Sequence, residues 1–285
     1  VNGGGTIQDG FRLYSGSAGS TIRGLVIQNF TQDGIDIYQS NGNTIVGNYI
    51  GITQAGTAAA GNQQGINIYD SSNSIIGGTT AADRNVISSN TSTGVDIAGS
   101  STNNIIRGNY LGTNAAGTAD LGNATYGISV DSSGNTIGGS VSGAGNVISG
   151  TGTSGTSKFG IALSASASGT TIQGNYIGTN AAGTSAIVNQ GSGIEVLSSG
   201  NTIGGTTSLA RNVISGNADS GISISGASAT GNTILGNYIG LNAAGTTALG
   251  NSSRGISVSS ASGTIIGDGT ATGRNVISAN TGSGI

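Results

Sequence analysis

Hydrophobic residues occur along this chain in short alternating groups that are separated by small or polar residues. The segments Ile35–Ile37, Thr44–Val46 and Tyr49–Ile50 illustrate the pattern. β-Branched residues dominate these groups, and Gly, Asn and Ser fill the gaps between them, which is typical of strands and turns. The abundance of Gly further disfavours helix. The pattern therefore predicts an all-β chain.

The hydrophobic groups recur at a fixed period. The string GNYIG or GNYLG begins at Gly47, Gly108, Gly174 and Gly236, and the string NVIS begins at Asn85, Asn146, Asn212 and Asn275. Each series steps by 61 to 66 residues and the two series interleave, so one unit is about 31 residues long. Gly10–Asp33 follows the same template in only 24 residues, which makes the rest of each longer unit an insertion. Internal repeats of this length indicate a solenoid.

Three short strands in each unit predict a coil that closes a triangle and climbs by one strand spacing of about 4.8 Å. We expect a single right-handed parallel β-helix (β-solenoid) over residues 1–285, with about ten three-stranded coils of 24–34 residues. The loop insertions alternate between two corners: in one type of coil they follow the third strand, and in the other they precede it. Because neither end shows a polar cap, we expect a fragment of a longer repeat array.

Aliphatic residues at equivalent positions are expected to stack along the axis of this solenoid. One inward column of the second strand is predicted to contain Ile22, Ile45, Ile75, Ile105, Ile137, Ile172, Ile203, Ile234 and Ile265. The preceding position is predicted to face outward and holds Thr in seven coils, with Ser74 and Asn104 in the other two. An array of Thr raises the alternative of an ice-binding solenoid. The next outward position is mixed, however, so the Thr column is better explained by the β-propensity of Thr.

Asn occupies the turn before the third strand in eight coils. These residues are Asn48, Asn85, Asn109, Asn146, Asn175, Asn212, Asn237 and Asn275. Asn tolerates the left-handed backbone of a sharp corner, and its amide can donate to one coil while accepting from the next. We therefore predict an internal Asn ladder with a structural role.

Composition and charge exclude several classes of function. The chain contains no His and no Cys, which removes disulfides, thiolate nucleophiles, His-based triads and the common zinc sites. The net charge of −3 comes from eight basic and eleven acidic residues, with no basic stripe for nucleic acid and no apolar run that spans a membrane. We expect no resident metal. Ca²⁺ bound by loop oxygens is the one cofactor left open, although the acids are scattered.

One outward column near the N-terminus gathers the candidates for chemistry. Arg12, Asp36, Asn67 and Asp96 lie in this column, and Tyr14, Tyr38 and Tyr69 lie two positions further along. Asp36 and Asp96 are two coils apart, about 9.6 Å, which is near the upper limit for inverting glycoside hydrolysis. The column shows no second acid on the same coil. We assign no catalytic residue, keep Asp36, Asp96 and Arg12 as candidates, and regard Asn67 and the three Tyr as candidates for sugar binding.

The strings GNYIGTNAAGT, LGN, NTIGG and RNVISGN resemble the tandem repeats of large secreted or cell-surface bacterial proteins with a right-handed parallel β-helix, within the pectin-lyase-like fold. The resemblance covers the chain from about Gly10 to its end. It implies this fold and an extracellular or cell-surface location. Pectate lyases, polygalacturonases, alginate lyases and phage tailspikes share the fold, but their catalytic motifs do not occur here, so the resemblance transfers no catalytic residue.

The sequence favours a non-catalytic structural or adhesive solenoid, such as a cell-surface spacer, an adhesin stalk or a filament segment. The partners expected for this role are further copies of the chain, stacked end to end through uncapped coils, or a cell-surface or matrix polysaccharide. The alternative is a polysaccharide-binding or polysaccharide-degrading protein, a lyase or hydrolase, that uses the face around Asp36 and Asp96. Ice binding is the second alternative.

Overall fold

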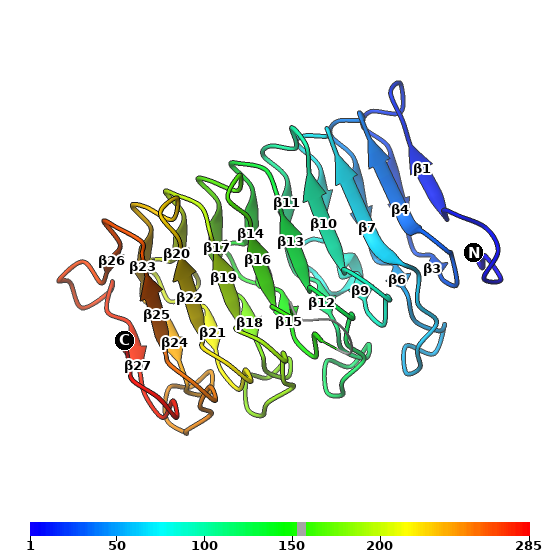
Figure 1. Cartoon of the computed structure of the whole chain (residues 1–285). Coiled ribbons are helices and arrows are strands. Elements are labelled where there is room, and N and C mark those ends of the chain that lie inside the picture. The colour runs from blue at the N-terminus through cyan, green and yellow to red at the C-terminus, as the bar shows by residue number, and fades with distance from the viewer. Residues whose placement is uncertain (153–157) are drawn as a thin grey trace.

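The chain folds into a solenoid of parallel strands, as its computed structural model shows for residues 1–152 and 158–285. Three sheets of nine strands each run the length of the rod (Figure 1). Neighbours within a sheet are three strands apart in sequence because every coil contributes one strand to each sheet. The predicted right-handed parallel β-helix is confirmed, with nine complete coils instead of about ten.

Strand lengths are short throughout, and one 3₁₀ turn, η1 (Ala81–Asp83), accompanies the strands. The first sheet consists of β1 (Phe11–Leu13), β4 (Asp33–Tyr38), β7 (Gln64–Tyr69), β10 (Val95–Ala98), β13 (Ile128–Val130), β16 (Ile161–Leu163), β19 (Ile194–Val196), β22 (Ile222–Ser225) and β25 (Ile256–Ser259). The second consists of β2 (Thr21–Arg23), β5 (Thr44–Val46), β8 (Ile75–Ile76), β11 (Ile105–Ile106), β14 (Thr136–Gly138), β17 (Thr171–Gln173), β20 (Thr202–Gly204), β23 (Thr233–Leu235) and β26 (Ile265–Ile266). The third consists of β3 (Val26–Ile27), β6 (Tyr49–Ile50), β9 (Val86–Ile87), β12 (Tyr110–Leu111), β15 (Val147–Ile148), β18 (Tyr176–Ile177), β21 (Val213–Ile214), β24 (Tyr238–Ile239) and β27 (Val276–Ile277). No helix in the described part of the chain is long and apolar enough to cross a membrane.

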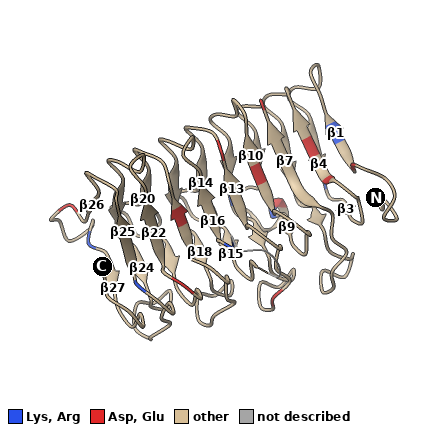
Figure 2. Cartoon of the chain, viewed as in Figure 1, with Lys and Arg blue, Asp and Glu red and all other residues tan. Residues whose placement is uncertain are grey.

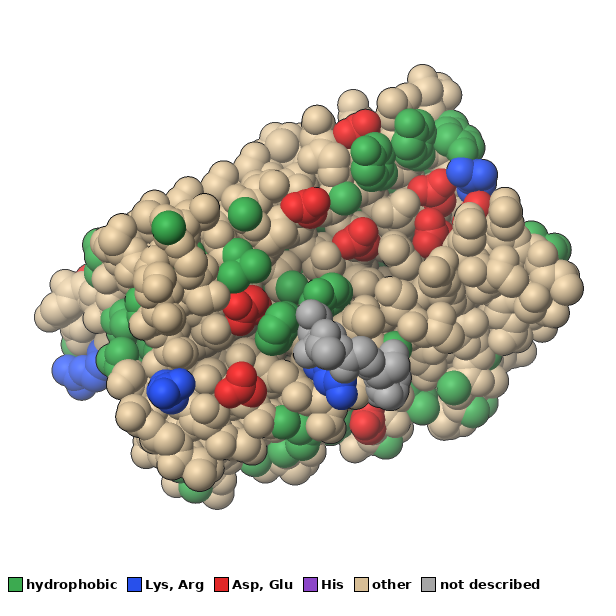
Figure 3. Space-filling model, in the orientation of Figure 1, with side chains coloured by type: hydrophobic (Ala, Val, Ile, Leu, Met, Phe, Trp, Pro, Cys, Tyr) green, Lys and Arg blue, Asp and Glu red, His purple; other side chains and the backbone are tan. Residues whose placement is uncertain are grey.

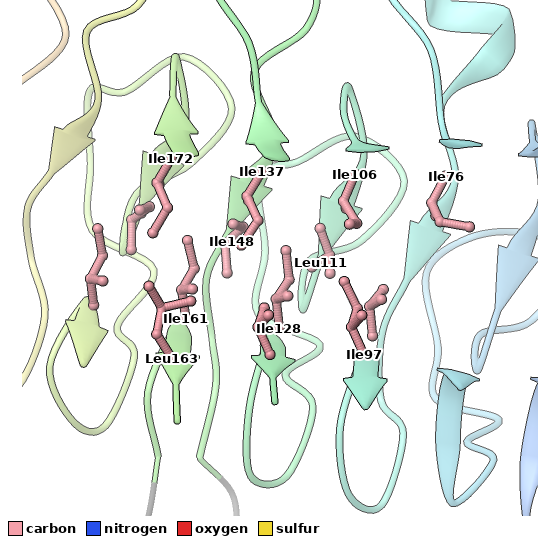
Figure 4. Close-up of a cluster of buried hydrophobic side chains, with 14 of the residues drawn as sticks. Ile76, Ile97, Ile106, Leu111, Ile128, Ile137, Ile148, Ile161, Leu163 and Ile172 are labelled. Atoms are coloured by element: carbon pink, nitrogen blue, oxygen red, sulfur yellow. The ribbon is translucent and has the colours of Figure 1, made fainter. Parts of the chain in front are cut away.

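A column of aliphatic side chains from each sheet meets along the axis of the rod. A single coil contributes Ile128 from β13, Ile137 from β14 and Ile148 from β15, and all three side chains are fully buried. Figure 4 shows that the equivalent residues of neighbouring coils point into the same interior. Since burying an isoleucine stabilises the fold by roughly 1.5–3 kcal/mol, the repeated column is the main source of stability for this Gly-rich backbone.

The predicted inward column of the second sheet is wrong at three coils. The inward residues there are Ile76, Ile106 and Ile266, as the strand register shows. The outward residues, which share the Thr column, are Ile75, Ile105 and Ile265. Each of these coils has two consecutive isoleucines, so alternation alone does not reveal which one faces the core. Ser74 and Asn104, predicted to face outward, are instead fully buried at a corner.

Each corner of the triangle is held by a ladder of polar side chains. At the turn before the third sheet, the side-chain amide of each Asn donates to the side-chain oxygen of the next, at 2.9–3.1 Å, from Asn48 to Asn275. Two further ladders, which the sequence analysis missed, stand at the other corners. One contains Asn62, Asn90, Asn123, Asn189, Asn217, Asn251 and Asn280, and it is interrupted at Thr151, where only the backbone N–H donates to Asn189. The other contains Asn43, Ser74, Asn104, Asn135, Thr170, Asn201 and Asn232.

The loops that follow alternate strands of the third sheet stack directly on one another. The Ala115 amide donates to the Gly56 carbonyl at 2.9 Å, and the same bond recurs between the next two pairs of loops. Gly56 has a φ of 69°, and a Cβ atom there would lie 3.2 Å from the ring of Tyr49. These loops therefore cover the outer side of the third sheet and leave the face of the first sheet open for function.

Candidate functional site

The outer face of the first sheet brings together the residues that the sequence analysis singled out. In the strand register, Arg12 of β1 lies opposite Asp36 of β4, Asp36 opposite Asn67 of β7, and Asn67 opposite Asp96 of β10. These four residues thus occupy one column on four consecutive coils. We call this face, from β1 to β13, the N-terminal face.

An ion-pair network fixes the first two residues of the column. Arg12 Nε lies 3.2 Å from Asp36 Oδ2 and 3.3 Å from Asp9 Oδ2. The side-chain amide of Asn67 donates to Asp36 Oδ1 at 3.1 Å. Asp36 is 5% exposed, so its carboxylate is buried between a guanidinium and an amide. These contacts orient Asp36 and hold it in place, because both of its oxygens have a partner.

A second acid, Asp33, lies on the same coil as Asp36, which the sequence analysis did not expect. Its backbone N–H donates to Asp9 Oδ1 at 3.1 Å. Burial and, to a smaller extent, the negative charges of Asp36, Asp9 and Asp96 together raise the pKa of Asp33 to about 7, against the opposing effect of Arg12. The sequence feature that could have revealed Asp33 is its position, directly before a Gly-Ile pair that recurs in each coil as Gly-Ile or Gly-Val. That position forms a further column at the start of the strand, which the sequence analysis did not consider, and three of its members, Thr93, Ser192 and Ser220, are buried.

Replacing Asp33 with Asn should stabilise the protein at alkaline pH. Because the folded state holds the Asp33 proton more tightly than the unfolded chain, this carboxyl lowers stability progressively as the pH rises from 3.8 towards about 7. We expect Asp33→Asn to have a higher Tm than the wild type at pH 8 and a similar Tm at pH 3, measured by thermal unfolding across this range.

Asp268→Asn is the matched control for this experiment. Hydrogen bonds from Thr270 lower the pKa of Asp268, so its carboxylate stabilises the folded state at neutral pH and this contribution is lost on acidification. The two variants should therefore deviate from the wild type in opposite directions above pH 7. A Tm difference for Asp33→Asn that is independent of pH would contradict the assignment.

Three tyrosines form a stack beside the charged column. The ring centroids of Tyr38 and Tyr69 are 5.6 Å apart with nearly parallel planes, and those of Tyr14 and Tyr38 are 5.5 Å apart, edge to face. The Arg12 guanidinium lies 4.7 Å from the Tyr14 ring centroid. Tyr38 is therefore enclosed by its neighbours. Tyr69 is 40% exposed, and beyond it the register places the methyl side chain of Ala98.

The open end of the tyrosine stack is bordered by two carboxylates. Asp96 lies in the charged column on the same strand as Ala98, and Asp131 directly follows β13 on the next coil. Burial raises the pKa of Asp96, as does the charge of Asp131, while a hydrogen bond from Ser129 lowers it. Figure 3 shows hydrophobic side chains beside acidic ones at this end of the molecule. We call the surface over Ala98, between Tyr69 and Asp131, the Ala98 subsite.

The strands of this sheet carry more negative than positive charge. Asp33, Asp36, Asp96 and Glu195 are acidic, and Arg12 is basic. Figure 2 shows the acidic positions in red on β4 and β10. Burial also raises the pKa of Glu195, which the sequence analysis overlooked in the continuation of the charged column. In the described part of the chain, no three or more acidic side chains are grouped to hold a metal ion, so we carry no Ca²⁺ into the proposed function.

Comparisons with solved structures find other solenoids. The chain is similar to an alginate lyase from Paenibacillus sp. str. FPU-7, with 16% identity and a TM-score of 0.49 over 96% of this chain and 88% of that one. It is similar to the periplasmic alginate epimerase AlgG, with 17% identity and a TM-score of 0.50 over 82% of this chain and 47% of that one. A third neighbour is the catalytic domain of a GH87 alpha-1,3-glucanase, with 14% identity and a TM-score of 0.32 over 96% of this chain and 57% of that one. At these identities the similarity concerns the fold alone.

No curated protein sequence matches the chain. A family model does: the one described as the right handed beta helix region matches residues 5–177. This match covers more than half of the sequence and includes the strands from β1 to β18, and the same coils continue to β27. The chain therefore belongs to the right handed beta helix family.

Proposed function

We propose that this protein binds a polysaccharide along the N-terminal face, with one sugar ring seated in the Ala98 subsite. The observation that carries the proposal is the stack of three tyrosines, which ends in the exposed ring of Tyr69 over the small side chain of Ala98. This role corresponds to the alternative that the sequence left open, and not to the non-catalytic structural role that it favoured.

The chemistry of the Ala98 subsite suits a sugar. The face of a sugar ring presents C–H groups, which bury apolar surface when they pack on an aromatic ring. Its hydroxyl groups can donate to the carboxylates of Asp96 and Asp131 and accept from the amide of Asn67. The small side chain of Ala98 leaves room for the ring, and the flat sheet face extends along the axis on both sides of it, as an extended chain of sugars requires.

The charge of the face selects among polysaccharides. Three acidic residues against one basic residue on its strands would repel a polyuronate, whose every sugar carries a carboxylate. A neutral or amine-bearing polysaccharide meets no such repulsion, and an ammonium group would be attracted to Asp96 and Asp131. The alginate epimerase of similar fold acts on a polyuronate, so we expect the specificity of this chain to differ from it. Because such polymers lie outside the cytoplasm, we also propose an extracellular or periplasmic location.

Binding to a panel of oligosaccharides tests the proposal. We expect chitosan or neutral glucan oligomers to bind and alginate or polygalacturonate oligomers not to bind, as measured by calorimetry. Tyr69→Ala should weaken binding about two- to tenfold, because an aromatic contact contributes about 0.5–1.5 kcal/mol. Ala98→Leu, which fills the subsite, should have a similar effect.

Tyr110→Leu is the control variant, because Tyr110 lies on the third sheet under Arg84. Its affinity should equal that of the wild type. Equal binding of polyuronates would overturn the selection by charge. Failure of every oligomer to bind, or binding that Tyr69→Ala leaves unchanged, would overturn the proposed function.

Hydrolysis of the bound chain is a second candidate function, favoured by the presence of Asp33 and Asp36 on the same strand. A carboxyl that holds its proton near neutral pH beside a carboxylate in an ion pair matches the acid and base roles of glycoside hydrolysis. A reducing-end assay on the oligomers that bind would detect it. Activity should then disappear in Asp33→Asn while binding is retained.

A further inference from the structure

Four loops between the second and third sheets share one length and one template. They span residues 77–85, 138–146, 204–212 and 267–275, and each ends at an Asn of the ladder. The residue before this Asn is Arg84, Arg211 or Arg274 in three of the loops. In the remaining loop it is Gly145. The repeat therefore lacks one arginine in the middle of the rod.

The arginine of this template covers a tyrosine of the next coil. The Arg84 guanidinium lies 4.1 Å from the ring centroid of Tyr110, and the Arg211 guanidinium lies 4.1 Å from that of Tyr238. Arg211 Nε also donates to the Gly236 carbonyl at 3.0 Å. A planar cation over an aromatic face is thus a repeated element of this side of the solenoid, and at Arg211 a backbone carbonyl completes it.

Tyr176 is the corresponding tyrosine for Gly145, and its ring has no such cover. Among the residues that the structure describes, no cation lies over Tyr176, whereas Tyr110 and Tyr238 each have one. A cavity of about 210 Å³ opens at this position, and its lining includes Tyr176, Gly145 and Gly174. The Gly174 carbonyl occupies the place in the repeat that the Gly236 carbonyl has beside Arg211.

We propose that this cavity, the Tyr176 site, binds a guanidinium group supplied by another molecule. The aromatic face takes the plane of the cation, as in both coils that carry their own arginine, and the Gly174 carbonyl accepts one of its N–H groups, as the Gly236 carbonyl does from Arg211. Arg211 also lines the cavity, but its guanidinium faces Tyr238. Its positive charge weakens the site, so we expect dissociation constants in the millimolar range. This site lies on the other side of the rod from the polysaccharide and does not depend on it.

Titration with ethylguanidinium, followed by NMR of the tyrosine ring protons, tests the proposal. We expect a saturable shift at Tyr176 and no comparable shift at Tyr110 or Tyr238, whose ring faces are already covered. Ethylurea, which has a similar shape and no charge, should produce no saturable shift. Acetyl-arginine amide in a parallel titration distinguishes an arginine side chain from a small guanidinium compound. Binding of both ligands supports the site, whereas equal shifts at all three rings or an equal response to ethylurea would overturn it.

A second variant tests the same chemistry by creating a new site. Arg84→Gly should open an equivalent cavity over Tyr110, so ethylguanidinium should now shift the Tyr110 ring and raise the Tm of the variant more than that of the wild type. The reverse variant, Gly145→Arg, is less informative because a Cβ atom at Gly145 would lie only 1.9 Å from the Gly174 carbonyl oxygen. Failure of ethylguanidinium to act at Tyr110 in Arg84→Gly would contradict the proposal.

Discussion

Replacing Asn146 with Ala should lower the free energy of unfolding by about 3–6 kcal/mol, because each buried polar group left without a partner costs about 1–3 kcal/mol. Asn146 Oδ1 accepts from the Asn109 backbone N–H at 3.0 Å and from the Asn109 side-chain amide at 3.1 Å. Its own amide donates to the Ile106 carbonyl at 2.8 Å and to Asn175 Oδ1 at 2.9 Å. The substitution removes these four hydrogen bonds and leaves the Asn109 backbone N–H without a partner, whereas the Asn109 side-chain amide keeps the carbonyls of Ile76 and Arg107. Urea unfolding followed by circular dichroism measures the change.

Gln63→Ala serves as the control for the loss of a side-chain amide, because Gln63 is exposed. We expect its free energy of unfolding to change by less than about 0.5 kcal/mol. If Asn146→Ala were equally mild, the ladder would contribute little and the corner backbone would have to be satisfied in another way.

Replacing Ile106 with Ala should lower the free energy of unfolding by about 2–5 kcal/mol, the usual range for truncation of a fully buried isoleucine. Ile106 is 0% exposed and lies between Ile76 and Ile137 in the inward column (Figure 4). The truncation would leave a cavity in the single narrow core of the solenoid. Because the neighbouring strands hold the backbone in place, the surrounding side chains cannot easily move in to fill it. The same urea titration measures the loss.

The neighbouring residue provides the matched control. Ile105 has the same side chain on the same strand, but it faces outward between Ile75 and Thr136. Ile105→Ala should cost about 1 kcal/mol or less, mainly through the lower β-propensity of Ala. Equal losses for the two variants, or a larger loss for Ile105→Ala, would show that the register is displaced by one residue.

The sequence predicts part of the candidate site. Counting along equivalent positions is enough to align Arg12, Asp36, Asn67 and Asp96, because a coil of constant template brings equivalent residues into register. Asp33 was missed because it lies in a different column, at the first residue of β4 and three residues before Asp36. Its raised pKa depends on burial and on three neighbouring charges, which are properties of the folded surface.

The arrangement of the three tyrosine rings could not be predicted from the sequence either. Their spacing predicts a row of rings on consecutive coils, all equally suited to bind sugars. The structure instead stacks Tyr38 between Tyr14 and Tyr69, so that Tyr69 is left with a ring face towards Ala98. Side-chain torsions decide whether neighbouring rings expose or cover their faces, and the sequence does not specify these torsions.

The sequence by itself determined the fold, the stacking of coils, the alternation of loops between two corners and the Asn positions before the third sheet. These properties follow from period and residue type, since a repeat that is too short to bury its own apolar face must stack on its neighbours. Tertiary structure alone decided which isoleucine of each adjacent pair faces the core, which acid retains its proton, which tyrosine face stays open and where a missing arginine leaves a cavity. Each of these depends on contacts between coils about 30 residues apart, where a shift of one residue exchanges the inside of the rod for its outside.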